Sequence, residues 1–156
     1  MSLARSLALL AALFAAAPLG ALAQSASAAP KGARTGEQVY TQVCAACHAS
    51  GVAGSPKFGD AATWKPLIEE GQAVLTAHAF VGVRGMPARG GAPDLTLAEF
   101  ARGAAHMARG AGGTWSDPDA AMLRKIAAEA SKRLDRNIRE AQELKAHLKA
   151  AARDIR

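Results

Sequence analysis

The most constraining feature of the chain is the pentapeptide Cys44-Ala45-Ala46-Cys47-His48. Two thiols that are separated by two residues and followed directly by a histidine have the spacing of c-type haem attachment. Each sulfur can form a thioether with one vinyl group of the porphyrin, and the adjacent histidine can supply an imidazole nitrogen to the iron. The motif therefore predicts one haem c, covalently attached through Cys44 and Cys47, with His48 as an iron ligand.

Other uses of a cysteine pair fit the sequence less well. A structural zinc site needs four protein ligands, usually from a second Cys or His pair. A thioredoxin-like redox site needs a preceding strand within a βαβ unit. A structural disulfide is the remaining alternative, because Cys44 and Cys47 are the only cysteines in the chain.

The N-terminus has the features of an export signal. Arg5 precedes a continuous apolar run, and small residues at 21–23 offer a cleavage site. We therefore expect a cleavable signal peptide over 1–23, a flexible leader over 24–34, and a periplasmic mature protein. An uncleaved anchor is the alternative, and small residues at 26–28 leave the cleavage position open. The apolar run is shorter than the ~20 residues of a membrane span, and no later segment is longer, so we expect no stable membrane span.

Residues 35–115 have the pattern of one small all-α domain without β alternation. Capping boxes at Thr35 with Gln38 and at Thr96 with Glu99 mark two helix starts. The expected helices are 36 to about 44, a short one after Asp60, one around 74–81, and one from 97 to the glycines at 110–113. Aromatic residues make up only 4% of the chain, so a covalent haem would add apolar bulk to a small core.

The remaining segment, 116–156, reads as a single long helix with a coiled-coil pattern. Pro118 suits the first helical position, and a helix over 118–155 would be about 57 Å long. The helix has two heptad seam positions. The first is occupied by Ala120, Ala127, Leu134, Ala141, Leu148 and Ile155, and the second by Leu123, Ala130, Asn137, Leu144 and Ala151. All but Asn137 are apolar, which predicts self-association or docking on a partner's helix, with the haem domain held outside. A solvated helix, supported by the i,i+4 pairs Glu129–Arg133 and Asp135–Arg139, is the alternative.

The second iron ligand is open among five side chains. The candidates are Met86, Met107, Met122, His78 and His106. Met86 lies in a glycine-rich loop beside Pro87, and such a loop can bring a thioether sulfur over the ring without burying unpaired backbone. Met107 follows Phe100 and Ala104 at the spacing of a helix face in the core. The pattern favours Met86, and a loop methionine above an open five-coordinate haem is the alternative.

Several segments in fixed order carry a family resemblance. They are Cys44–His48, Gly54-Ser55-Pro56-Lys57-Phe58-Gly59-Asp60, Trp64, Met86-Pro87-Ala88-Arg89-Gly90-Gly91 and Asp94-Leu95-Thr96. Together, over about 35–112, they resemble class I c-type cytochromes, and most closely the small bacterial cytochromes of the c-five type. The resemblance implies an all-α fold around one haem, in which the first and last helices of the domain cross. It also implies His48 and Met86 as the two axial ligands, and Gly36 and Tyr40 facing the last helix.

The resemblance leaves three positions to be explained. Trp64 stands where the family often has an aromatic lining the haem pocket, and its indole could bond a haem carboxylate or simply pack in the core. His106 stands where the family often has Tyr. The helix after Ser116 does not belong to the usual short cytochrome.

The charge pattern narrows the classes of partner. The formal net charge is +6, yet the chain has no long run of like charge and no aromatics among its basic residues, so nucleic-acid binding has no support. Lys57, Arg84 and Arg89 fall in loops near the haem and could steer acidic redox partners, or could be ordinary solubilising charge.

The sequence favours a periplasmic electron carrier over an enzyme, because no nucleophile is paired with a base and an orienting group. The alternatives are a haem-bearing subunit docked on a larger redox complex through its long helix, and a five-coordinate haem sensor.

Overall fold

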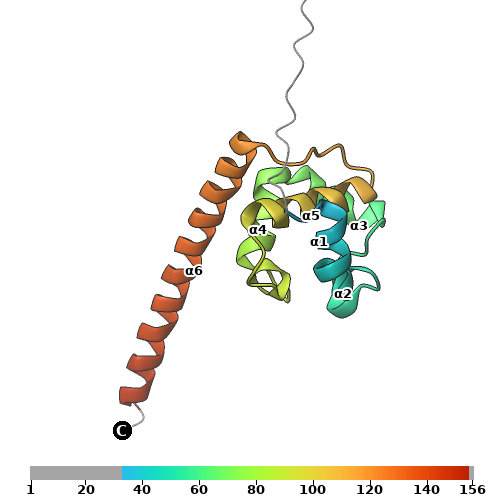
Figure 1. Ribbon diagram of the computed structural model, residues 1–156. Helices are drawn as coiled ribbons and strands as arrows, with labels where there is room; N and C mark the ends of the chain where they lie inside the picture. The colour runs from blue at the N-terminus through green and yellow to red at the C-terminus, as the bar shows by residue number, and fades with distance from the viewer. Residues whose placement is uncertain (1–32, 155–156) are drawn as a thin grey trace, which may run out of the picture.

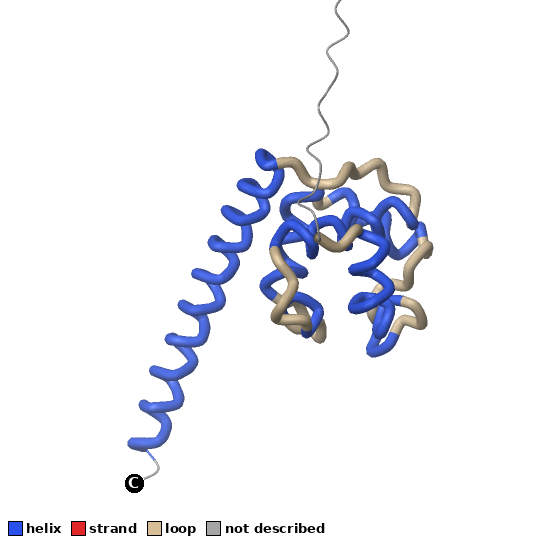
Figure 2. The backbone as a smooth tube through the Cα atoms, viewed as in Figure 1, coloured by secondary structure: helices blue, strands red, loops and turns tan. Residues whose placement is uncertain are grey.

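The computed structural model describes residues 33–154, and within that range every regular element is helical (Figure 2). The helices are α1 (Gly36–Val39), α2 (Ala45–His48), α3 (Ala61–Glu69), α4 (Gln72–Val81), α5 (Leu97–Gly110) and α6 (Ala120–Asp154). The only β-type pairing in this range is an isolated bridge between Val83 and Met86. The predicted all-α fold is confirmed, whereas the expected signal peptide, 1–23, lies outside the described residues.

The first helical segment runs without interruption from α1 into α2. It begins at the predicted capping box, where Thr35 accepts from the backbone N–H of Gln38 and the Gln38 side chain accepts from the N–H of Thr35. Between α1 and α2, residues Tyr40–Cys44 form a π-helical turn, in which the N–H of Ala45 donates to the carbonyl of Tyr40. A π turn shifts the register of the side chains that follow it, and such turns are frequent at functional sites.

The crossing of α1 and α5 depends on two glycines. A Cβ atom on Gly36 would collide with the carbonyl oxygen of Arg102, and one on Gly103 would lie only 2.7 Å from Cγ1 of Val39. Only glycine allows the two backbones to approach this closely. The predicted crossing of the first and last domain helices is therefore present.

The other helices of the domain lie close to their predicted positions, although α4 begins at Gln72 rather than near 74. The Asp60 carboxylate accepts from the backbone N–H of Thr63 and caps α3, and Gly71, with φ of +90°, separates α3 from α4. In Figure 1, α2 stands on one side of the domain and the loop that follows α4 on the other, with α5 running above both. This arrangement gives the domain two lobes that face each other.

Helix α6 differs from the predicted appendage in two ways. It begins at Ala120, two residues later than expected, because the carboxylate of Asp119 accepts from the N–H of Met122 and caps it. Its first half packs along α4, where Ile126 is fully buried with Ala77 and Ala101.

The second half of α6 continues past the domain, as Figure 1 shows. From Leu134 to Arg153 every residue is exposed, including Ile138, Leu144 and Leu148. The expected pair of Glu129 with Arg133 is absent, because Glu129 pairs instead with Lys132 at 2.7 Å. None of the described helices is both long and apolar enough to cross a membrane.

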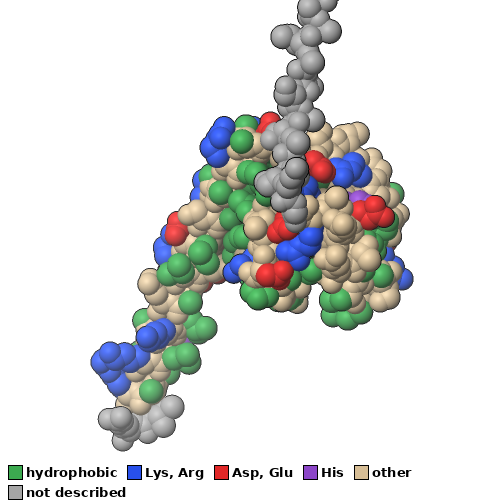
Figure 3. Space-filling model, in the orientation of Figure 1, with side chains coloured by type: hydrophobic (Ala, Val, Ile, Leu, Met, Phe, Trp, Pro, Cys, Tyr) green, Lys and Arg blue, Asp and Glu red, His purple; other side chains and the backbone are tan. Residues whose placement is uncertain are grey.

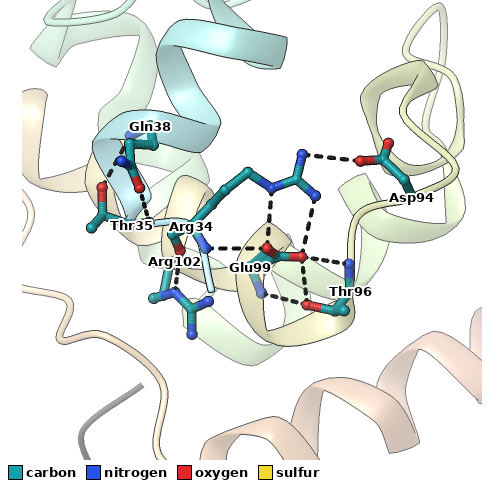
Figure 4. A network of polar contacts seen from close by, with 7 residues as sticks. All are labelled: Arg34, Thr35, Gln38, Asp94, Thr96, Glu99 and Arg102. Carbon is teal, nitrogen blue, oxygen red and sulfur yellow. Dashed lines mark hydrogen bonds and ion pairs between the residues drawn. The ribbon is translucent and has the colours of Figure 1, made fainter. Parts of the chain in front are cut away.

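A polar network joins the start of α1 to the start of α5 (Figure 4). The guanidinium of Arg34 donates to both carboxylate oxygens of Glu99 and lies 3.0 Å from a carboxylate oxygen of Asp94. Thr96 donates to Glu99 through its backbone N–H and its hydroxyl, and Arg102 donates to the carbonyl of Arg34. Arg34, which was expected in a flexible leader, is therefore fixed to the domain.

The network makes stability depend on pH. The bonds from Arg34, and then those from Thr96, hold the pKa of Glu99 far below its ordinary value of 4.5. As the pH falls below 4.5, Glu99 is protonated in the unfolded chain while it stays ionised in the folded chain. The contribution of the network to the free energy of unfolding is therefore lost as the pH falls. Glu99→Gln is expected to cost ~1.5–3 kcal/mol at neutral pH and to flatten the loss of stability between neutral pH and about pH 3. Denaturant unfolding across that range measures both effects, and the exposed Glu37→Gln is the control; an unchanged acid profile in Glu99→Gln would contradict the assignment.

Candidate functional site

One cavity between the two lobes brings together all four predicted site residues. Cys44, Cys47 and His48 line it from the first helical segment, and Met86 lines it from the loop after α4. The cavity has a volume of about 260 Å³. Most of the remaining lining is apolar and comes from Val43, Val52, Trp64, Leu67, Leu75, Phe100, Ala104 and Met107.

The orientation of His48 is fixed by the loop that follows it. The imidazole is buried, and its Nδ1 lies 2.8 Å from the carbonyl oxygen of Pro56, which can only accept, so Nδ1 carries the proton. Phe58 donates its backbone N–H to the carbonyl of His48 at 2.7 Å. This arrangement leaves Nε2 unprotonated and available as a ligand, as a carbonyl partner does for a metal-binding histidine.

The two cysteines differ in their surroundings. Cys44 is buried, and burial raises the pKa of its thiol to about 11, whereas Cys47 is exposed. A thioether is neutral and suits the buried position of Cys44 better than a thiolate does. The hydroxyl of Ser55 donates to the carbonyl of Cys47 at 2.9 Å and ties the second cysteine to the loop over 49–59.

Met86 is held in a tight turn on the opposite lobe from His48. Its backbone N–H donates to the carbonyl of Val83 at 2.9 Å, and its carbonyl accepts from the N–H of Val83 at 3.1 Å. Gly90, with φ of +65°, packs against Val43, where a Cβ atom would lie 3.3 Å from Cγ1, and it lies in contact range of the Met86 side chain.

The other four candidate ligands are placed differently. Met107 also lines the cavity, but it is a buried residue of α5 within the hydrophobic core. His78 lies 3.5 Å from the carboxylate of Glu70, His106 stacks on Phe58, and Met122 packs at the interface of α4 and α6. Of the five candidates, only Met86 both lines the cavity and lies in a loop facing the lobe of His48.

Trp64 is a buried residue whose indole has a partner within the protein. Its Nε1–H donates to the carbonyl oxygen of Lys57 at 2.7 Å. Of the two alternatives for this residue, the structure therefore favours packing, and the indole also fixes the loop that holds His48.

The three basic residues expected near the cavity have separate surroundings. Lys57 is exposed, and Arg84 is exposed at the cavity rim with φ of +52°. Arg89 is engaged within its own loop, since it donates to the carbonyl of Pro93 and lies 5.9 Å from the ring centre of Phe80. In Figure 3 hydrophobic side chains gather at the tips of both lobes, and Val52, 51% exposed, is one of the residues that line the cavity.

The residues of this cavity fit a covalently attached haem. Two thiols and an imidazole with a free nitrogen line it from one lobe, a thioether lines it from the other, and apolar side chains make up most of the remainder. A porphyrin needs such an apolar environment, and iron in this class of protein takes imidazole nitrogen and thioether sulfur.

Comparisons with known proteins agree with this chemistry. The family model for subunit III of the cbb3-type cytochrome c oxidase matches residues 31–107. Cytochrome c-555 of Chlorobaculum thiosulfatiphilum is 42% identical over 79 residues, which are 48% of this chain and 92% of that protein. The chain belongs to the c-type cytochromes. It is thus an electron-transfer protein with a covalent haem c rather than an enzyme.

Two further proteins are similar to about half of the chain. Cytochrome c5 of Ectopseudomonas mendocina is 37% identical over 73 residues, covering 46% of this cytochrome and 84% of its relative. A cytochrome c solved in an electron-transfer complex with nitrite reductase is 39% identical, with a TM-score of 0.47 over 49% of this chain and 93% of that one. The family match ends at residue 107, so α6 lies outside it.

Trp64→Phe tests the role of the indole. The change removes the donor to the Lys57 carbonyl and is expected to lower the free energy of unfolding by ~1–3 kcal/mol. Because this bond lies within the protein, the absorption spectrum and the midpoint potential should stay the same. Trp115→Phe, at a half-buried Trp whose indole has no described partner, should cost less; a shifted potential without a stability loss would favour a bond to the haem instead.

Proposed function

We propose that this cytochrome is a periplasmic electron carrier whose haem is attached through Cys44 and Cys47 and ligated by His48 and Met86. The observation that carries the proposal is the single apolar cavity that these four residues line from two opposed lobes. The haem supplies a one-electron couple between ferrous and ferric iron. His48 and Met86 would hold the iron through an imidazole nitrogen and a thioether sulfur, which would leave no coordination position for a substrate.

The surrounding residues determine how the ligands behave. The Pro56 carbonyl keeps the His48 imidazole in one tautomer and one orientation, which strengthens it as a donor. A thioether stabilises ferrous iron, so Met86 would raise the potential above that of a bis-histidine site. The backbone pairing of Met86 with Val83 fixes the backbone from which the thioether extends into the cavity.

The mouth of the cavity is the natural docking surface for redox partners. Cys47 and Val52 are exposed residues of its lining, Arg84 adds positive charge at the rim, and Lys57 is an exposed basic residue of the loop that follows His48. A small apolar contact with a charged rim suits short-lived complexes, and the charge would steer acidic donors or acceptors.

We also propose an organisation of the chain that agrees with this role. Residues 1–23 would direct export and be removed, 35–115 would form the haem domain, and 116–156 the added helix. Export is required because haem is joined to such thiols outside the bacterial cytoplasm.

Substitution of Met86 tests the ligand assignment. Met86→His should lower the midpoint potential, and Met86→Ala should let the iron bind carbon monoxide or cyanide, since a thioether is lost in both. The methionine-to-iron band near the red edge of the absorption spectrum should disappear in both variants.

The control is Met107, which lines the same cavity from the core. Met107→Leu should keep the band and change the free energy of unfolding by less than ~1.5 kcal/mol, as a volume-conserving core change does. The opposite pattern, with the band lost in Met107→Leu and kept in Met86→Ala, would reverse the assignment.

The free half of α6 supports a second proposal, which is association with a second copy of this chain. The stripe that α4 covers at Leu123 and Ala130 continues at helical spacing through Leu134 and Leu148, where it is exposed. Leu134 is 50% and Leu148 60% exposed, although both are large apolar side chains. A helix that is surrounded by solvent gains nothing from a continuous apolar stripe, so the exposed stripe favours a partner that covers it.

The packing of the first half restricts how a second helix can lie. A partner helix can pack only on the exposed part of the stripe, because α4 and the haem domain already cover the part that lies before Leu134. The restriction is met when the free halves of α6 from two chains pack against each other in antiparallel orientation. Each haem domain then lies beyond the end of the other chain's helix. With so few large side chains in contact, such a dimer would be weak.

The dimer can be tested on the full-length holoprotein. Sedimentation velocity from about micromolar to millimolar concentration should show a concentration-dependent dimer. Leu144→Lys, in the stripe, should abolish it, whereas Ala150→Lys adds the same charge on the opposite face and should not. A monomer at every concentration, or equal effects of the two variants, would exclude the dimer. Truncation within the first half is unsuitable, because it would uncover the site of Ile126.

A further inference from the structure

A second recess adjoins the haem cavity and is lined by charged residues. It has a volume of about 500 Å³ and is lined by Leu67, Glu70, Leu75, His78, Val83, Arg84 and Arg133. Four of these residues, Leu67, Leu75, Val83 and Arg84, also line the haem cavity, so the recess and the cavity share a wall. None of the residues around the recess comes from the first helical segment, which carries the two cysteines.

Arg133 is the residue of α6 that reaches this recess. It is half-buried, whereas all residues from Leu134 to Arg153 are exposed, and its Nε is buried without a hydrogen-bond partner among the described residues. Glu129, which precedes it by one turn on α6, is paired with Lys132 instead. A buried guanidinium nitrogen without a partner indicates a binding site for a group that the protein itself does not supply.

The charges around the recess favour an anion. Arg84 also faces it and makes no ion pair with any described residue. The carboxylate of Glu70 lies 3.5 Å from Nδ1 of His78 and forms no ion pair with Arg84 or Arg133, which leaves two guanidinium groups without an acid. Guanidinium groups bind carboxylates through paired, charge-assisted hydrogen bonds.

We infer that this recess takes a carboxylate of the attached haem, held by Arg133 from α6 and Arg84 from the loop. The inference rests on the proposed haem site. On a porphyrin the carboxylates lie at the edge opposite the vinyl groups, and the recess adjoins the cavity away from the cysteines that bind those groups. Arg133 thereby ties α6 directly to the redox centre, which the first half of the helix makes possible by packing along α4.

The test compares charge variants of the full-length holoprotein by redox titration. Arg133→Gln removes a positive charge beside the carboxylate, which favours ferric iron, so the midpoint potential should fall. Arg136→Gln, which makes the same charge change at an exposed site on α6, should shift it much less. Arg133→Lys keeps the charge and should restore most of the potential, which a role in packing alone would not do.

A second readout is amide hydrogen exchange in α6. Loss of the carboxylate contact should speed exchange around Arg133 in Arg133→Gln and leave it slow in Arg136→Gln. Equal potentials and equal exchange in the two Gln variants would overturn the inference and leave the recess to an external anion, such as a carboxylate of a partner protein. In that case the methionine-to-iron band would still be present, so the proposed haem site would be unaffected.

Discussion

The close crossing of α1 and α5 is the contact on which the rest of the domain depends. Gly36 and Gly103 allow the two helices to touch along their backbones, and the Arg34–Glu99 network fixes the ends where they start. Because α1 continues through the π turn into α2, the same crossing determines where Cys44, Cys47 and His48 stand. The cavity between the lobes therefore takes its position from this helix contact, which Cys44 adjoins at Gly103.

Backbone carbonyls accept the hydrogen bonds that orient the side chains of the site. His48 is oriented by the carbonyl of Pro56, and Trp64 by that of Lys57, so one short stretch of loop fixes both the predicted iron ligand and the aromatic beside it. Neighbouring residues of a loop can perform these roles together only if the loop itself is rigid. Ser55 contributes to this rigidity by donating to the carbonyls of Cys47 and Val52.

The sequence predicted those parts of the structure that depend on local chemistry. The cysteine-histidine motif, the capping boxes at Thr35 and Thr96 and the glycine-rich loop of Met86 each carry their signal in a few adjacent residues. It did not predict the π turn at Tyr40–Cys44 or the partner of Trp64. In both cases the acceptor is a backbone carbonyl, which every residue has, so the sequence does not indicate which carbonyl accepts the bond. The packing of α6 was also missed, since its heptad pattern does not reveal that Ile126 meets small residues of α4 and α5. The start of α6 at Ala120 follows from a local signal, the carboxylate of Asp119, which caps the helix two residues after the start that Pro118 suggests.

Helix α6 contains neither glycine nor proline from Ala120 to Asp154, and only its first half is anchored. A molecule bound to its free half would be held at a fixed distance and in a fixed direction from the haem domain, unlike one attached through a flexible linker. Such a rigid tether converts a bimolecular encounter into an intramolecular one, and the high effective concentration favours only those partners whose geometry matches its length. The helix would then select redox partners by where their own electron-accepting groups lie, in addition to the chemistry of their surfaces.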